Sequence, residues 1–143
     1  MKKFIGIAAL IFLVLLGIQS TRSVSLDEPS RGGDQRIVSL APNLTEILFE
    51  LGLGDQIVGV TNYCTYPPEA LEKEKVGGFI NPNLEKIVSL KPDLVVSEQW
   101  PSSKTVPRLR EFGLQVLEVI SPKSFEEIYQ VIRGVGKAVN RCQ

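Results

Sequence analysis

Short runs rich in β-branched residues alternate along the chain with longer apolar stripes that have helical spacing. Such runs are typical of buried strands, and the stripes are typical of amphipathic helices. The predicted strands are residues 36–40, 56–60, 93–97 and 115–120. The predicted helices are residues 44–51, 66–71, 84–90, 106–112 and 125–139. Alternation of strands with helices predicts an α/β fold with a mainly parallel sheet flanked by helices.

Local signals mark the ends of these helices. Asn43 stands three residues before Glu46, which is typical of a capping box, and Ser124 with Glu127 repeats the pattern. Asn83 is the expected cap of the helix that follows it. Gly52 and Gly113 are placed to end the helices before them, and Pro92 is expected to end the helix predicted at residues 84–90.

Two eight-residue segments are almost identical. IVSLAPNL, residues 37–44, and IVSLKPDL, residues 87–94, differ at two positions. Their flanking residues predict different structures: strand, turn and helix for the first, and the end of a helix followed by a strand for the second. Repeat proteins need about three or more units to bury a core. The sequence therefore indicates a coincidence and not an array.

The N-terminus has the features of an export signal. Lys2 and Lys3 precede an uncharged apolar run at residues 4–18. The run is short for a membrane span, which needs about 20 residues. Residues 1–25 are therefore predicted to be a signal peptide, with an uncleaved anchor as the alternative. Residues 26–35 are the predicted linker, residues 36–143 the folded part, and an extracytoplasmic location is expected.

Composition excludes several functions. The chain has 16 basic and 16 acidic residues and no basic patch suited to nucleic acid. Without histidine, a Cys–His nucleophile and most zinc sites are unavailable, so we expect neither an enzyme nor a metal or cofactor site. Export makes a disulfide between Cys64 and Cys142 feasible, but the sequence does not establish it. Cys64 by itself is interpreted as a small buried residue. Residues 69–75, which carry five charges, are interpreted as a solvated cluster.

The candidate site lies at the predicted carboxyl ends of the strands, where open α/β sheets bind ligands. These ends carry aromatic, polar and small residues: Ala41, Pro42, Asn62, Tyr63 and Trp100. Phe79, which lies in a glycine-rich connector, is expected to join them. Aromatic rings with a few polar groups suit a large, partly flat organic ligand. The alternative is structural: Tyr63 and Trp100 cover the sheet edge, and Phe79 fills the core.

Three segments, residues 36–70, 75–96 and 109–119, resemble the N-terminal lobe of periplasmic solute-binding proteins of the cobalamin and iron-siderophore class. The motifs are the strand–Ala-Pro–helix opening, Tyr-x-x-Tyr-Pro-Pro-Glu-Ala from Tyr63, and Asn-Leu-Glu-x-Ile from Asn83. The resemblance implies a Rossmann-like lobe, one of two joined by a long helix with the ligand between them. The second lobe is absent from this sequence.

The resemblance also implies a function. It implies the non-enzymatic solute-binding component of an ABC importer, which captures cobalamin or a related corrinoid and delivers it to the membrane permease. Tyr63 and Phe79 match cleft residues, and Glu85 matches an acid that docks onto permease arginines. A ferric siderophore or haem is the alternative ligand, although the strand ends carry no arginine for an anionic chelate. A truncated α/β domain without transport activity is the alternative of another class.

Overall fold

The structure is a computed structural model that describes residues 35–100 and 104–139. The predicted signal peptide, nearly all of the predicted linker, and Cys142 lie outside the described residues. Within the described ranges, no helix is both long and apolar enough to cross a bilayer.

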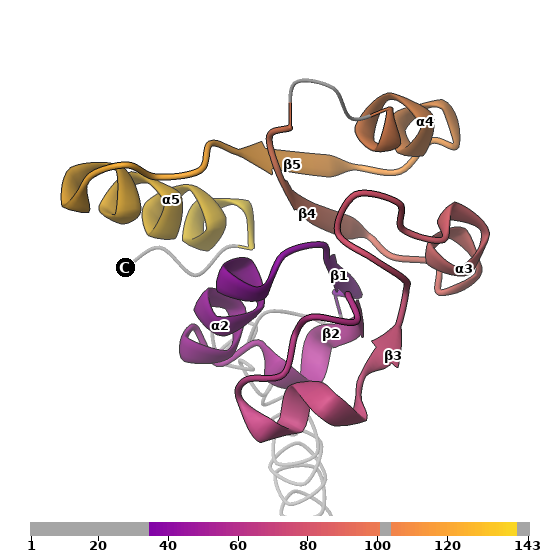
Figure 1. The fold of residues 1–143 in the computed structure, drawn as a ribbon, viewed down its shortest axis with the longest axis horizontal. Coiled ribbons are helices and arrows are strands. Elements are labelled where there is room, and N and C mark those ends of the chain that lie inside the picture. The colour runs from indigo at the N-terminus through magenta and orange to yellow at the C-terminus, as the bar shows by residue number, and fades with distance from the viewer. Residues whose placement is uncertain (1–34, 101–103, 140–143) are drawn as a thin grey trace, which may run out of the picture. The chain divides into compact units, whose positions relative to one another are not determined.

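A five-stranded sheet forms the centre of the fold (Figure 1). Its strands are β1 (Ile37–Ser39), β2 (Ile57–Val60), β3 (Glu74–Lys75), β4 (Leu94–Glu98) and β5 (Val116–Val119). They are all parallel, in the order β3-β2-β1-β4-β5. The predicted parallel α/β fold is therefore confirmed, with β3 as a strand that the sequence did not predict.

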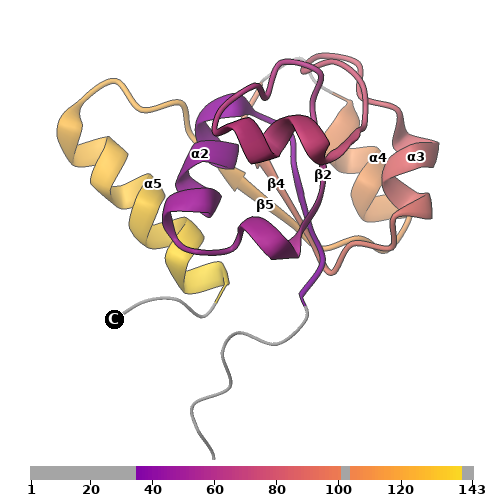
Figure 2. The same ribbon diagram turned by 90° about the horizontal axis from the view of Figure 1, so that it is seen from below.

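Helices cover both faces of the sheet (Figures 1 and 2). Helices α2 (Pro42–Glu50) and α5 (Phe125–Ala138) pack on one face, and α3 (Leu84–Ser89) and α4 (Thr105–Glu111) pack on the other. Neighbouring residues of a strand point to opposite faces, so Ile37 of β1 joins the core with α2 and α5, whereas Val38 joins the core with α3 and α4. Burial on both faces explains why the central strands β1, β2 and β4 are mainly apolar.

Two 3₁₀ helices complete the described elements: η1 (Gly54–Gln56) and η2 (Pro68–Glu72). The short helix predicted at residues 66–71 is thus the 3₁₀ helix η2. The two near-identical segments adopt different structures, as predicted. Residues 37–39 form β1, whereas the same letters at residues 87–89 close α3. Ile37 and Ile87 are both fully buried, so the shared letters serve packing in each setting.

Two of the three predicted caps are confirmed. The Asn83 side chain accepts a hydrogen bond from the Lys86 N–H at 2.9 Å, and Ser124 accepts one from the Glu127 N–H at 3.3 Å. The prediction that Asn43 caps a helix was wrong, because the N-cap residue of α2 is Ala41. Helix α2 begins two residues earlier than predicted because Pro42, whose ring favours helical geometry, occupies its first position. Asn43 therefore lies inside the first turn, and its side chain is free to bond elsewhere.

The interpretation of residues 69–75 as a solvated cluster holds for Glu69, Glu72 and Glu74, which are exposed, but not for Lys75, which is half-buried. Glu74 and Lys75 form β3, which pairs with Gly59 and Val60 of β2. The Lys75 ammonium donates to the carbonyl oxygens of Cys64 at 2.9 Å and Ala70 at 3.0 Å. These bonds attach the segment after β2 to the edge strand.

Candidate functional site

The order of the strands creates a switch point between β1 and β4, because the chain leaves these neighbouring strands toward opposite faces, into α2 and α4. Ligands of open α/β sheets bind in the crevice at such a point. Here the Asn43 amide donates to Glu98 Oε1 at 2.6 Å, and the Ser121 hydroxyl donates to Glu98 Oε2 at 3.1 Å. Glu98, the last residue of β4, is therefore bonded to the first turn of α2 and to the segment that follows β5. No local signal could have revealed this role, since the partners lie 55 and 23 residues away.

The two small residues predicted at this edge lie deeper than expected. Ala41 is only 1% exposed and packs in the core on the α2 side, and Pro42 is half-buried at the start of α2. Neither is among the described residues that line the two hollows reported below. A ligand role for either residue stays a prediction.

A closed loop at residues 77–82 carries Phe79. Gly77 and Pro82 form an antiparallel bridge at its base, and the Asn83 N–H donates to the Val76 carbonyl at 2.7 Å. Gly77 has φ +101°, and a Cβ there would lie 3.0 Å from the Asn83 nitrogen. Only glycine combines this backbone conformation with so close an approach. The Asn62 N–H donates to the Gly77 carbonyl at 2.9 Å and joins the loop to the end of β2.

The loop brings together the three predicted aromatic residues. The Phe79 and Trp100 rings lie edge to face, with centroids 5.8 Å apart and an interplanar angle of 86°. Tyr63, which is 65% exposed, lines an open hollow of about 470 Å³ together with Phe79 and residues of the loop. Asn62 is exposed beside Tyr63 in the sequence. Phe79 also packs against the core, so its two proposed roles are compatible. The role of each residue toward a ligand stays a prediction.

A second hollow of about 480 Å³ lies on the other side of the loop's tip. It is lined by residues from the 77–82 loop, α3, the end of β4 and α4: Ile80, Asn81, Pro82, Leu84, Trp100, Lys104, Thr105 and Arg108. Lys104 and Arg108 were not predicted as site residues, because neither lies at the carboxyl end of a strand. The available signal was their helical spacing just after Trp100.

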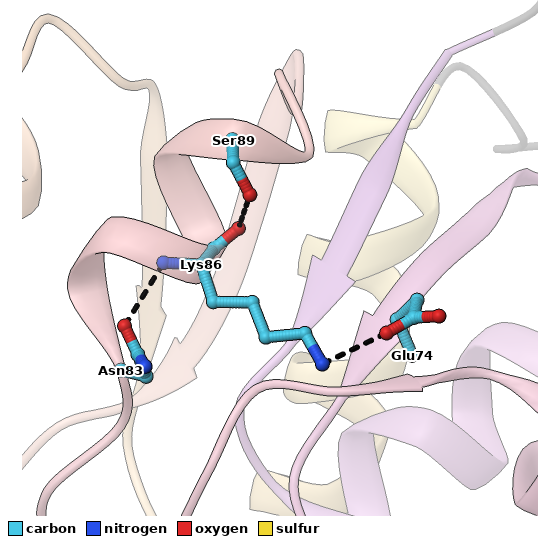
Figure 3. Close-up of polar contacts among 4 residues, drawn as sticks. All are labelled: Glu74, Asn83, Lys86 and Ser89. Atoms are coloured by element: carbon cyan, nitrogen blue, oxygen red, sulfur yellow. Dashed lines mark hydrogen bonds and ion pairs between the residues drawn. The ribbon is translucent and has the colours of Figure 1, made fainter.

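The predicted docking residue lies on α3, apart from the aromatic rings. Glu85 is exposed in the first turn of this helix and forms no hydrogen bond or ion pair with another residue that the structure describes. The helix itself is held firmly (Figure 3). Lys86 reaches Glu74 of β3 at 2.8 Å, and Ser89 donates to the Lys86 carbonyl at 2.7 Å. The pKa of Glu74 is lowered mainly by the hydrogen bond from Lys86 and, to a smaller extent, by the positive charge of Lys86.

Cys64 is a free, fully buried thiol, which confirms its interpretation as a packing residue. Its sulfur lies 3.2 Å from the Thr45 hydroxyl and 3.1 Å from the Thr61 hydroxyl, and both threonines are buried. In residues 35–100 and 104–139, no group of three or more Cys, Asp and Glu side chains is arranged to hold a metal ion.

Comparison with known proteins identifies the fold family. Residues 37–142 match the periplasmic binding protein family. The chain belongs to this family. The predicted architecture, one α/β lobe of a periplasmic binding protein, is thereby confirmed.

Two relatives show how much of such proteins the chain represents. An uncharacterized ABC transporter substrate-binding lipoprotein of Bacillus subtilis (strain 168), YvrC, is 41% identical over 131 residues, which are 90% of this chain and 40% of that protein. A vitamin B12-binding protein of Vibrio cholerae serotype O1 is 42% identical over 104 residues, which are 71% of this chain and 37% of that protein. The chain therefore spans about two fifths of the length of these relatives.

Solved structures of family members share the fold. The apo form of the periplasmic heme-binding protein RhuT from Roseiflexus sp. RS-1 is 36% identical with a TM-score of 0.70, over 76% of this chain and 42% of that one. The periplasmic vitamin B12-binding protein BtuF of Vibrio cholerae is 39% identical with a TM-score of 0.64, over 72% of this chain and 40% of that one.

Proposed function

We propose that this lobe belongs to the solute-binding component of an ABC importer and binds cobalamin or a related corrinoid without catalysing a reaction. The observation that carries the proposal is that Tyr63 and Phe79 line an open hollow at the carboxyl edge of the sheet, with the Trp100 ring against Phe79. The family supports it, as does the vitamin B12-binding protein among the relatives. An extracytoplasmic location is part of the proposal.

The geometry suits a large ligand with a flat ring system. Tyr63 exposes most of its ring, and exposed aromatic faces contribute large contact areas with little loss of side-chain entropy. Small-molecule sites bury most of the ligand surface, and the hollow seen here is open. A single lobe contacts one face of the ligand, so its affinity is expected to be far weaker than that of a closed two-lobed cleft.

Tyr63→Ala tests the binding site. We expect the dissociation constant for cyanocobalamin, measured by absorbance titration of the full chain, to rise about tenfold. A loss of this size is typical when an aromatic side chain that becomes buried on binding is removed. Tyr129→Ala is the matched control, because Tyr129 is 60% exposed on α5 and lines neither hollow. Equal affinities of the wild type and Tyr63→Ala, or no binding by the wild type, would reject the corrinoid assignment.

Delivery to the permease is assigned to Glu85. A charged residue on a surface contributes little to stability but guides and orients a partner. We expect Glu85→Lys to leave cyanocobalamin binding unchanged and to reduce corrinoid uptake by cells that contain the permease. Glu46, which is also exposed and lies on α2, provides the charge-matched control Glu46→Lys. Loss of binding in Glu85→Lys would instead place Glu85 in the ligand site.

Haem is the second candidate ligand. Two observations favour it: the heme-binding protein RhuT is 36% identical to this chain, and two cations line the hollow beside Trp100. Direct competition between cyanocobalamin and haemin on the same protein decides between the two ligands. If haemin displaces cyanocobalamin at a much lower concentration than the reverse, the lobe belongs to a haem receptor.

A further inference from the structure

The hollow beside Trp100, here called the Trp100 groove, adjoins the hollow lined by Tyr63. Both are lined by Ile80 and Asn81, so the tip of the 77–82 loop forms the wall between them. Trp100 is 47% exposed in the groove and contacts Phe79, which lines the Tyr63 hollow. A ligand whose flat body lies on Tyr63 and Phe79 would therefore extend its periphery past Ile80 into the Trp100 groove.

The described lining of the groove carries positive charge alone. Its charged residues are Lys104 and Arg108, and no acidic residue is among them. Neither side chain forms a hydrogen bond or ion pair with another residue of the described ranges. Residues four apart on a helix share one face, so both cations stand on the same side of α4.

Helix stability does not account for Lys104. Lys104 occupies the N-cap of α4, where it makes no side-chain cap bond, and the first turn contains no acidic residue. A positive charge at a helix N-terminus opposes the helix dipole, and two like charges four residues apart repel each other. Lys104 therefore opposes the dipole of α4, whereas Arg108 lies in the last turn, where its charge favours the dipole. An anion in the groove would offset the charge of Lys104 at the N-cap and the repulsion between the two cations.

We propose that the Trp100 groove binds an anionic substituent, a phosphate or a carboxylate, on the periphery of the planar ligand. The guanidinium of Arg108 offers a fork of donors that matches either group, and Lys104 adds a second charge. This proposal rests on the proposed function, because it assigns part of the same ligand. It adds a requirement for negative charge, which the aromatic rings do not impose.

Two ligand classes supply the required group: the phosphate of a corrinoid and the propionate carboxylates of a haem. Matched probes separate the anion from the macrocycle. Cobinamide and cobinamide phosphate differ by the phosphate, and haemin and its dimethyl ester differ by the free carboxylates. Each probe is titrated into the full wild-type chain, the double variant Lys104→Gln/Arg108→Gln, and the control Lys137→Gln, which removes an exposed cation from α5.

We expect the wild type to prefer the anionic member of one probe pair by about fivefold to tenfold at low salt, as is typical of two partly exposed charge contacts. The double variant should lose this preference and bind the member that lacks the anionic group as tightly as the wild type does. Lys137→Gln should keep the preference, and Arg108→Lys should keep part of it, because it retains the charge without the fork. Added salt should reduce the preference, since exposed charges are screened.

The probe pair that shows the preference identifies the ligand class. Equal binding of both members, with no change in the double variant, would overturn the groove proposal and leave the proposed function standing. A wild type that binds none of the four probes would overturn the proposed function, and the groove proposal with it. Weaker binding by the double variant of the probes that lack the anionic group would also overturn the groove proposal, because the cations would then act on the fold. Circular dichroism of each variant checks that the fold is retained.

Discussion

The aromatic edge, formed by Tyr63, Phe79 and Trp100, and the α3 corner, which carries Glu85, are held in place by different kinds of bond. Backbone bonds close the loop that presents Phe79, including the 2.7 Å bond from the Asn83 N–H to the Val76 carbonyl. Side-chain bonds hold the α3 corner: the cap by Asn83 and the ion pair of Lys86 with Glu74.

This difference predicts different sensitivities. Substitutions that strain the backbone should damage the aromatic edge, whereas side-chain truncations should loosen the α3 corner and leave the edge intact. Asn83 takes part in both regions, its N–H in the loop and its side chain in the cap. It therefore allows the two kinds of bond to be separated at one residue.

The largest expected effect is that of Gly77→Ala. Alanine at φ +101° is strained, and its Cβ would crowd the backbone at Asn83 and Pro82. We expect the free energy of unfolding, measured by urea denaturation, to fall by about 1–3 kcal/mol. Cyanocobalamin affinity should fall as well, because Phe79 shifts with the loop.

Gly78→Ala is the matched control for this substitution. A Cβ at Gly78 would meet only the Tyr63 ring, at an ordinary contact distance of 3.9 Å, and the backbone there is not in the left-handed region. We expect nearly wild-type stability for this variant. Equal stabilities of the two alanine variants would show that the loop tolerates strain and that its backbone bonds do not position Phe79.

A smaller effect is expected for Asn83→Ala, which removes the cap of α3 but keeps the backbone bond that closes the loop. The loss of a side-chain cap costs about 1 kcal/mol of stability. Cyanocobalamin affinity should stay near that of the wild type, while uptake through the permease should fall as α3 loosens. Asn83→Asp keeps a capping oxygen and should restore stability. A large loss of cyanocobalamin affinity in Asn83→Ala would show that the aromatic edge also depends on the side-chain cap of α3.

The smallest effect is the pH dependence of the ion pair between Lys86 and Glu74. Lys86 holds the pKa of Glu74 below its ordinary value of 4.5 in the folded chain. A carboxyl group of this kind stabilises the fold above its unfolded pKa, and the contribution disappears as the pH falls through the folded pKa. The Tm values of the wild type and Glu74→Gln should therefore differ slightly at neutral pH and converge in acid. A difference that persists in acid would rule out the ion pair as its source.

Features encoded by neighbouring residues were predictable from the sequence. The caps at Asn83 and Ser124 depend on residues three positions away, and Gly52 and Gly113 follow the ends of α2 and α4 as expected. The parallel fold was predictable because buried strands and amphipathic helices have different periodicities. The aromatic residues were found by one rule, that ligands gather at the carboxyl ends of parallel strands.

Features that depend on distant residues were not predictable. Strand β3 has two charged residues and no apolar pattern, so only its pairing with β2 defines it. Asn43 fits the cap rule, but Pro42 starts the helix earlier and Glu98 takes its side chain. The position of Lys104 and Arg108 beside the 77–82 loop follows from the packing of α3 and α4 on one face of the sheet, which no local pattern encodes.

The central position of β1 has a consequence for the order of folding. This strand begins the described fold, yet it pairs on one side with β4, and the Arg36 N–H donates to the Asp93 carboxylate 57 residues later at 2.7 Å. The first strand therefore stays unpaired on that side until the chain has been made through Glu98, where β4 ends. Pairings so distant in sequence slow folding, because a long loop must close before any contact is formed. The nascent lobe is thus expected to remain open for most of its synthesis.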